Sequence, residues 1–138
     1  AQRLVSEVQG ECVRRGLRLG VAVVDTGGNL VAAARMDGAQ LGALGIATDK
    51  AFTAVSFGYP TSAWAQSSAP GGSDWGLGTT LGGRAIVFPG GVPLYLGGEL
   101  VGGLGASGAA ASDDEVKKAY RRQMNENHPD KLVARGLP

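Results

Sequence analysis

The sequence holds very few of the residues that most catalytic and metal sites need. Its 138 residues contain one cysteine and one histidine. A lone Cys12 excludes a disulfide within the chain and a cysteine metal cluster. Zinc ligation or a Ser-His-Asp triad would have to recruit His128. No lysine follows a glycine, so a Walker A phosphate loop is absent as well. The sequence therefore predicts no catalytic residues and no metal ligands.

Charge and long apolar runs are also scarce. Charged residues make up 18% of the chain, aromatic residues 6%, and the net charge is +1. This composition argues against a nucleic-acid partner, which requires a basic patch. No apolar run approaches the roughly 20 residues of a membrane span. No leader pattern opens the chain, but it starts at Ala1 rather than Met, so a removed export signal stays open. We expect a cytoplasmic protein with no membrane contact.

What the sequence does contain is a glycine-rich body followed by a different kind of tail. All glycines except Gly136 lie within residues 1–111, where basic and acidic residues balance. Residues 112–138 carry the only histidine and a denser set of charges. The length and the 43% of hydrophobic residues predict one core. We therefore expect a main domain over residues 1–112 and a separate segment over residues 113–138.

Apolar spacing predicts the order of elements in the body. Residues 4–13 and 43–57 have helical periodicity. Residues 19–35 predict a hairpin, because two apolar runs flank the turn sequence Asp-Thr-Gly-Gly-Asn. A short helix over residues 61–66 and a long loop over residues 67–83 follow. After the loop, three strands are expected, at Arg84–Phe88, Val92–Leu96 and Glu99–Leu104.

Several motifs, in this order, resemble those of the GlcG/HbpS family. They are VAVVDTGGNLV from Val21, RMDGA from Arg35, DKAFTA from Asp49, GRAIVFPGGVPL from Gly83 and GELVGGLGASG from Gly98. The resemblance covers residues 1–112 and implies an α/β (α+β) domain, in which helices flank a five-stranded antiparallel sheet in the profilin-like manner. It also implies homo-oligomers and, in several relatives, an association with haem or corrinoid-related metabolism.

The body has no histidine to serve as an axial ligand, so haem would need a substitute. Cys12, Met36, Tyr59 and Tyr95 are the candidates, and each is also an ordinary packing residue. The missing histidine argues against tight, low-spin haem binding, whereas surface binding or hydroxyl-ligated binding stays open.

A ligand site is expected around the second helix. Asp49, Lys50 and Thr53 share about one helical turn, and the turn over residues 89–93 can offer backbone N–H groups to an anion. The same residues also suit a solvated helix face and a simple turn. We expect a non-enzymatic module for a small anionic or haem-type ligand, with a haem-degrading or related enzyme as the alternative. The predicted ligand-binding residues are Asp49, Lys50, Thr53, Arg84, Phe88, Pro89, Gly90, Gly91, Val92 and Pro93.

The tail resembles part of a J-domain of the DjlA type. The likeness lies in SDDEVKKAYRRQMNENHPDK from Ser112. His128, Pro129 and Asp130 match the loop with which J-proteins stimulate their chaperone, and Lys117 and Arg121 belong to the basic helix before it. A co-chaperone-like interaction protein is thus a further alternative. The segment lacks a J-domain's first helix and its long third helix, so we expect no chaperone contact. Instead we expect a helix over residues 113–126 that packs on the main domain.

Overall fold

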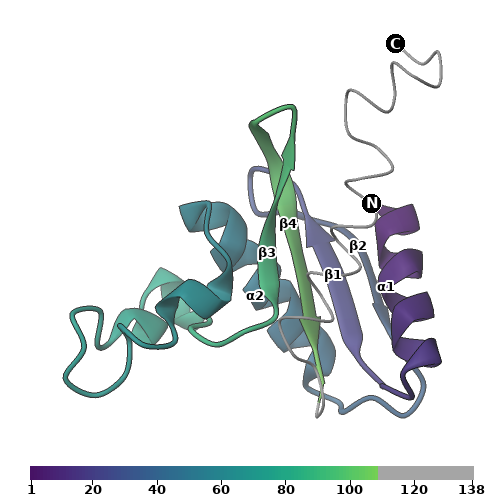
Figure 1. The fold of residues 1–138 in the computed structure, drawn as a ribbon, viewed down its shortest axis with the longest axis horizontal. Coiled ribbons are helices and arrows are strands. Elements are labelled where there is room, and N and C mark those ends of the chain that lie inside the picture. The colour runs from purple at the N-terminus through teal and green to yellow at the C-terminus, as the bar shows by residue number, and fades with distance from the viewer. Residues whose placement is uncertain (109–138) are drawn as a thin grey trace.

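The computed structural model describes residues 1–108, which form one open antiparallel sheet with a long helix on each side (Figure 1). Three short 3-10 turns connect the second helix to the third strand. They are η1 (Thr61–Trp64), η2 (Leu77–Thr79) and η3 (Leu81–Gly83). The helices and strands are α1 (Gln2–Arg14), β1 (Gly20–Val24), β2 (Leu30–Arg35), α2 (Ala43–Phe57), β3 (Gly91–Leu96) and β4 (Glu99–Ser107).

The sheet consists of two hairpins joined through β1 and β4. Its strand order is β2-β1-β4-β3, and every neighbouring pair is antiparallel. The β1–β2 turn is held by the Asp25 carboxylate, which accepts the N–H groups of Gly27 and Asn29 at 2.9 Å each. The N–H of Asn29, above all, keeps the pKa of Asp25 below its usual value. The hairpin predicted over residues 19–35 is confirmed.

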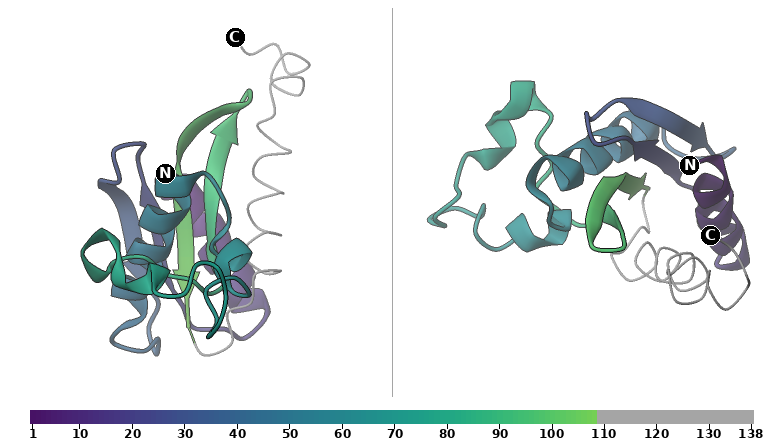
Figure 2. Two further views of the ribbon diagram at one scale, coloured as in Figure 1. Left: turned by 90° about the vertical axis from the view of Figure 1, so that its left-hand side faces the viewer. Right: turned by 90° about the horizontal axis from the view of Figure 1, so that it is seen from above.

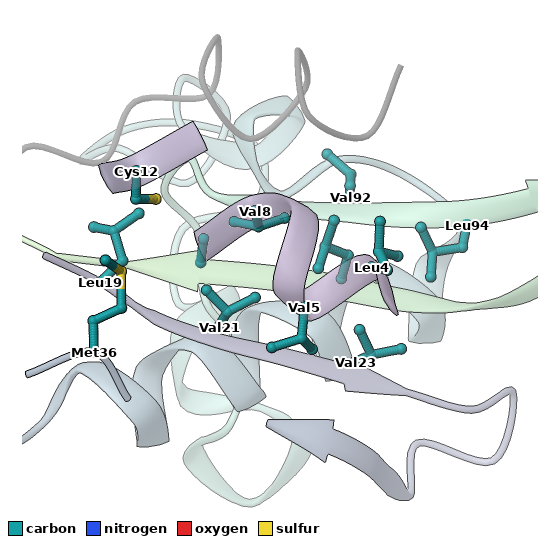
Figure 3. Packing of buried hydrophobic residues seen from close by; sticks show 12 residues of the cluster. Leu4, Val5, Val8, Cys12, Leu19, Val21, Val23, Met36, Val92 and Leu94 are labelled. Atoms are coloured by element: carbon teal, nitrogen blue, oxygen red, sulfur yellow. The ribbon is translucent and has the colours of Figure 1, made fainter. Parts of the chain in front are cut away.

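The two faces of the sheet bury different sets of residues, because side chains alternate along a strand. Val21 and Val23 of β1 lie in the main core beneath α1, whereas Val24 packs with Ala51 and Val55 of α2. Figure 3 shows the α1 side of the core in close-up. The main core comprises Leu4, Val5, Val8, Cys12, Leu19, Val21, Val23, Met36, Val92, Leu94, Leu104 and Ala106.

Segment 84–88, predicted to be a strand, is not one, so the described sheet has four strands where the resemblance implied five. The run Ala-Ile-Val-Phe has strand composition, but its backbone is hydrogen-bonded by a helix side chain and not by a neighbouring strand. The Ile86 N–H donates to Thr53 Oγ1 at 3.0 Å instead of joining a ladder. The helix expected over residues 61–66 is also shorter, and consists of the 3-10 turn η1 alone. Figure 2 shows the segment between α2 and β3 extending away from the sheet.

Helix α2 approaches the sheet so closely that the contact leaves no space for side chains at several strand positions. A Cβ placed on Gly105 of β4 would overlap the carbonyl oxygen of Ala47, and one on Gly20 of β1 would lie 2.7 Å from the carbonyl carbon of Ala43. The glycines of β1 and β4 are therefore required for this approach, which sets the position of α2 relative to the rest of the fold. Among residues 1–108, no helix is both long and apolar enough to cross a membrane.

Candidate functional site

Helix α2 brings two of the predicted ligand-binding residues to the segment that follows the long loop. Asp49 accepts a hydrogen bond from Arg84, with 2.9 Å between Arg84 Nε and Asp49 Oδ1. One turn further along, the buried Thr53 hydroxyl lies 3.2 Å from the Arg84 carbonyl oxygen and accepts the Ile86 N–H. These contacts fix segment 84–86 against α2 without any strand pairing.

The guanidinium of Arg84 lies on an aromatic ring that the sequence analysis did not select. Its central carbon is 3.8 Å from the centroid of Phe52, a distance at which a cation is attracted to the ring face. Phe52 lies three residues after Asp49 on α2, so helical spacing already placed the two on one side. An aromatic residue in a helix is usually interpreted as a core residue, and nothing in the sequence marked Phe52 as the support for Arg84.

Lys50 lies in a different place from Arg84. Its side chain is buried, with 3% of the residue exposed, and Nζ donates to the Ala106 carbonyl oxygen of β4 at 3.0 Å. The ammonium also lies 5.1 Å from the ring centroid of Phe88. Gly90 covers it closely, because a Cβ there would come within 2.5 Å of Nζ. The buried side chain of Lys50 thus connects α2 with β4 and with the turn before β3 in the interior of the protein.

The remaining predicted residues divide between surface and interior. Phe88 is 47% exposed and Pro89 is half-buried, whereas residues 90–93 are buried. The Gly91 N–H donates to the buried Thr61 hydroxyl at 2.9 Å, and the Gly90 carbonyl accepts the Ala106 N–H. The Gly91 N–H and the Gly90 carbonyl of this turn are therefore engaged within the protein. Within the predicted set, Arg84 and Phe88 are the two residues with large side chains that reach solvent.

The four candidate haem ligands are scattered through the structure. Cys12 and Met36 are buried in the main core, and the Tyr95 hydroxyl donates to the Gly58 carbonyl at 2.9 Å. Tyr59 is 57% exposed, with its ring edge-on to Trp64. Within residues 1–108, no group of three or more His, Cys, Asp or Glu side chains could hold a metal ion.

Comparisons with solved structures define the class of this fold. The Klebsiella pneumoniae protein ORFY superposes with a TM-score of 0.82 at 27% identity, covering 90% of this chain and 84% of that one. The PduOC–haem complex superposes with a TM-score of 0.78 at 29% identity, covering 86% of this chain and 85% of that one. The fold is the α+β arrangement of these proteins, with four strands and two long helices in the described residues.

Sequence comparison identifies the family. The uncharacterized 15.0 kDa protein of the dhaT-dhaS intergenic region of Citrobacter freundii is 31% identical over 116 residues, which is 84% of this chain and 82% of that protein. The family described as "Haem degrading protein HbpS-like" matches residues 1–119. This chain belongs to the HbpS-like family, and the resemblance seen in its motifs is confirmed.

The tail has a likeness of its own. It is 73% identical over 33 residues to the co-chaperone protein DjlA of Pasteurella multocida, a match that spans 22% of this chain and 12% of that protein. The predicted partner-binding residues and the predicted helix over residues 113–126 lie outside the described residues. The packing of the tail and the boundary at residue 112 stay predictions.

Proposed function

We propose that this chain is a non-enzymatic ligand-binding module of the HbpS-like type, whose ligand is haem or another small carboxylate-bearing molecule, corrinoid-related ones included. The observation that carries the proposal is the guanidinium of Arg84, which α2 holds in a fixed position with 40% of its side chain exposed. A haem complex of the related PduOC supports haem as the first ligand to test.

The described residues suit the periphery of haem better than its iron. Arg84 offers a cation for a carboxylate, and the exposed Phe88 ring offers an apolar contact. Of the four candidate iron ligands, Tyr59 alone among the described residues combines a largely exposed side chain with a phenolic oxygen. Bound haem would supply a planar apolar surface and two carboxylates, and Arg84 would hold one of the carboxylates by charge-assisted hydrogen bonds.

Titration with haemin tests this function directly. We expect a saturable change in the haemin absorbance. After incubation with a reductant and oxygen, followed by reoxidation, we expect the spectrum of the bound haemin to return in full. The matched control is the same buffer without protein, titrated with the same haemin concentrations, which reports haemin aggregation. Absence of saturable binding by a folded sample would contradict the proposal. Saturable binding followed by loss of the haem spectrum would favour the haem-degrading alternative instead.

The assembly state is a second part of the proposal. Leu30 and Val31 are each 55% exposed on β2. This strand lies at one edge of the described sheet and, unlike β3 at the other edge, contains no proline. Unpaired strand edges and apolar residues of this kind are commonly covered by a partner. We expect a symmetric homo-oligomer, at least a dimer, and light scattering should return at least twice the monomer mass of 14.0 kDa. A monomer mass at tens of micromolar protein would contradict this.

A further inference from the structure

The guanidinium of Arg84 is held from several directions at once. Its Nε donates to Asp49, and its central carbon Cζ lies 3.8 Å from the Phe52 centroid. The ring of Phe52 is itself restrained by the β1–β2 turn, since a Cβ on Gly28 would lie 2.7 Å from Phe52 Cδ2. On the main chain, the Arg84 N–H donates to the Leu81 carbonyl at 3.2 Å. A long, rotamer-rich side chain is thereby ordered before any ligand arrives.

The end of the same guanidinium has no such partner. Among residues 1–108, no hydrogen bond is donated by its two terminal amino groups, Nη1 and Nη2, and the side chain is 40% exposed. Nη1 and Nη2 present parallel N–H groups in a rigid plane, the geometry that matches the two oxygens of a carboxylate. The pairing with Asp49 uses Nε alone and leaves this outer edge open.

The backbone before Arg84 is unusual as well. Leu81, Gly82 and Gly83 have φ angles of 54°, 67° and 82°, a run of three left-handed residues. Leu81 is the one non-glycine residue with positive φ among residues 1–108, and this conformation is unfavourable for a residue with a Cβ. Strained backbone of this kind clusters at functional sites, where the surrounding structure holds it in place. Here it delivers Arg84 onto Phe52 and Asp49.

We propose that the Nη edge of Arg84 is a preformed docking point for a ligand carboxylate, with Asp49 and Phe52 as positioning residues. This inference rests on the proposed ligand-binding function and names the chemical group that the site selects. Asp49 has an informative double role, because its negative charge disfavours a nearby anion while its hydrogen bond orients the guanidinium. In this proposal preorganisation outweighs charge, so removal of Asp49 weakens carboxylate binding although the site becomes more positive.

The first experiment compares haemin with its dimethyl ester, in which both carboxylates are blocked. We expect wild-type protein to bind haemin roughly tenfold more tightly than the ester, the effect of one charge-assisted hydrogen-bonded pair. Arg84→Lys should lose that preference, because an ammonium lacks the planar fork. The matched control is Arg3→Lys on the exposed side of α1, which should keep it. Asp49→Ala should bind haemin more weakly, and tighter binding would overturn the positioning role.

A second measurement separates this inference from haem binding. Benzoate and its neutral analogue benzamide are titrated against the Arg Nε–H resonances of the wild-type protein, with Arg84 assigned by its absence in Arg84→Lys. A saturable shift of the Arg84 signal with benzoate and not with benzamide supports the docking point even where haemin fails to bind. Haemin and its ester binding equally to wild type would overturn the inference and leave haem binding intact. No benzoate response from a folded protein that also fails to bind haemin would overturn it too.

Discussion

Gly105→Ala is expected to destabilise the protein by about 3 kcal/mol or more, at the upper end of the usual penalty for overpacking a core. The new Cβ would overlap the Ala47 carbonyl oxygen and lie 2.8 Å from the Ala51 amide nitrogen. Both are backbone atoms of α2, so no side chain can rotate to make room. The helix as a whole would have to move away from β4, and the contacts of Asp49, Lys50 and Thr53 would move with it.

A glycine on the helix itself provides the matched control. Gly45 lies inside α2, and a Cβ placed there meets nothing within 4 Å. Gly45→Ala should therefore raise stability by about 0.5–1 kcal/mol, because alanine is the better helix former. The same chemical change then has opposite signs at the contact between α2 and β4 and on the exposed face of α2. Urea unfolding of both variants measures the difference. A Gly105→Ala protein as stable as wild type would show that α2 does not contact β4 as described.

Local patterns sufficed for the parts of the fold that depend on local chemistry. The helices α1 and α2 follow from apolar periodicity, and the β1–β2 hairpin follows from the turn at Asp25. Segment 84–88 could not be predicted in this way. Its composition favours a strand, but its structure is decided by a hydrogen bond from Ile86 to Thr53, 33 residues earlier. A single sequence carries no signal for a contact of that kind.

The candidate site shows the same limit. Helical spacing predicted that Asp49 and Lys50 lie about one turn from Thr53, yet these two adjacent residues have opposite environments. Asp49 is at the surface with Arg84, and Lys50 is buried beneath Gly90. Which neighbour is buried depends on where β4 and the turn before β3 lie, and neither is close in sequence. The family resemblance directed attention to the DKAFTA motif, but not to Phe52 within it as the support of Arg84.

Lys50 provides the second large expected effect. Its stem fills space between α2 and β4, and its ammonium donates to the buried Ala106 carbonyl. Lys50→Ala removes both contributions and should lower stability by about 3 kcal/mol, as for other large-to-small changes in a core. Lys50→Met keeps most of the stem and removes the charge. It should lose about 1 kcal/mol, the penalty for a buried acceptor deprived of its donor.

The pair of variants also tests whether Lys50 acts on ligands or on the fold. Its ammonium is covered by Gly90 and lies near the Phe88 ring, whereas the open edge of Arg84 faces solvent. A structural tether predicts that Lys50→Met is less stable than wild type and still prefers haemin to its dimethyl ester. Loss of that preference at unchanged stability would instead place Lys50 in the ligand site. A Lys50→Met protein more stable than wild type would mean that desolvation of the buried ammonium outweighs its contacts, and the tether would be refuted.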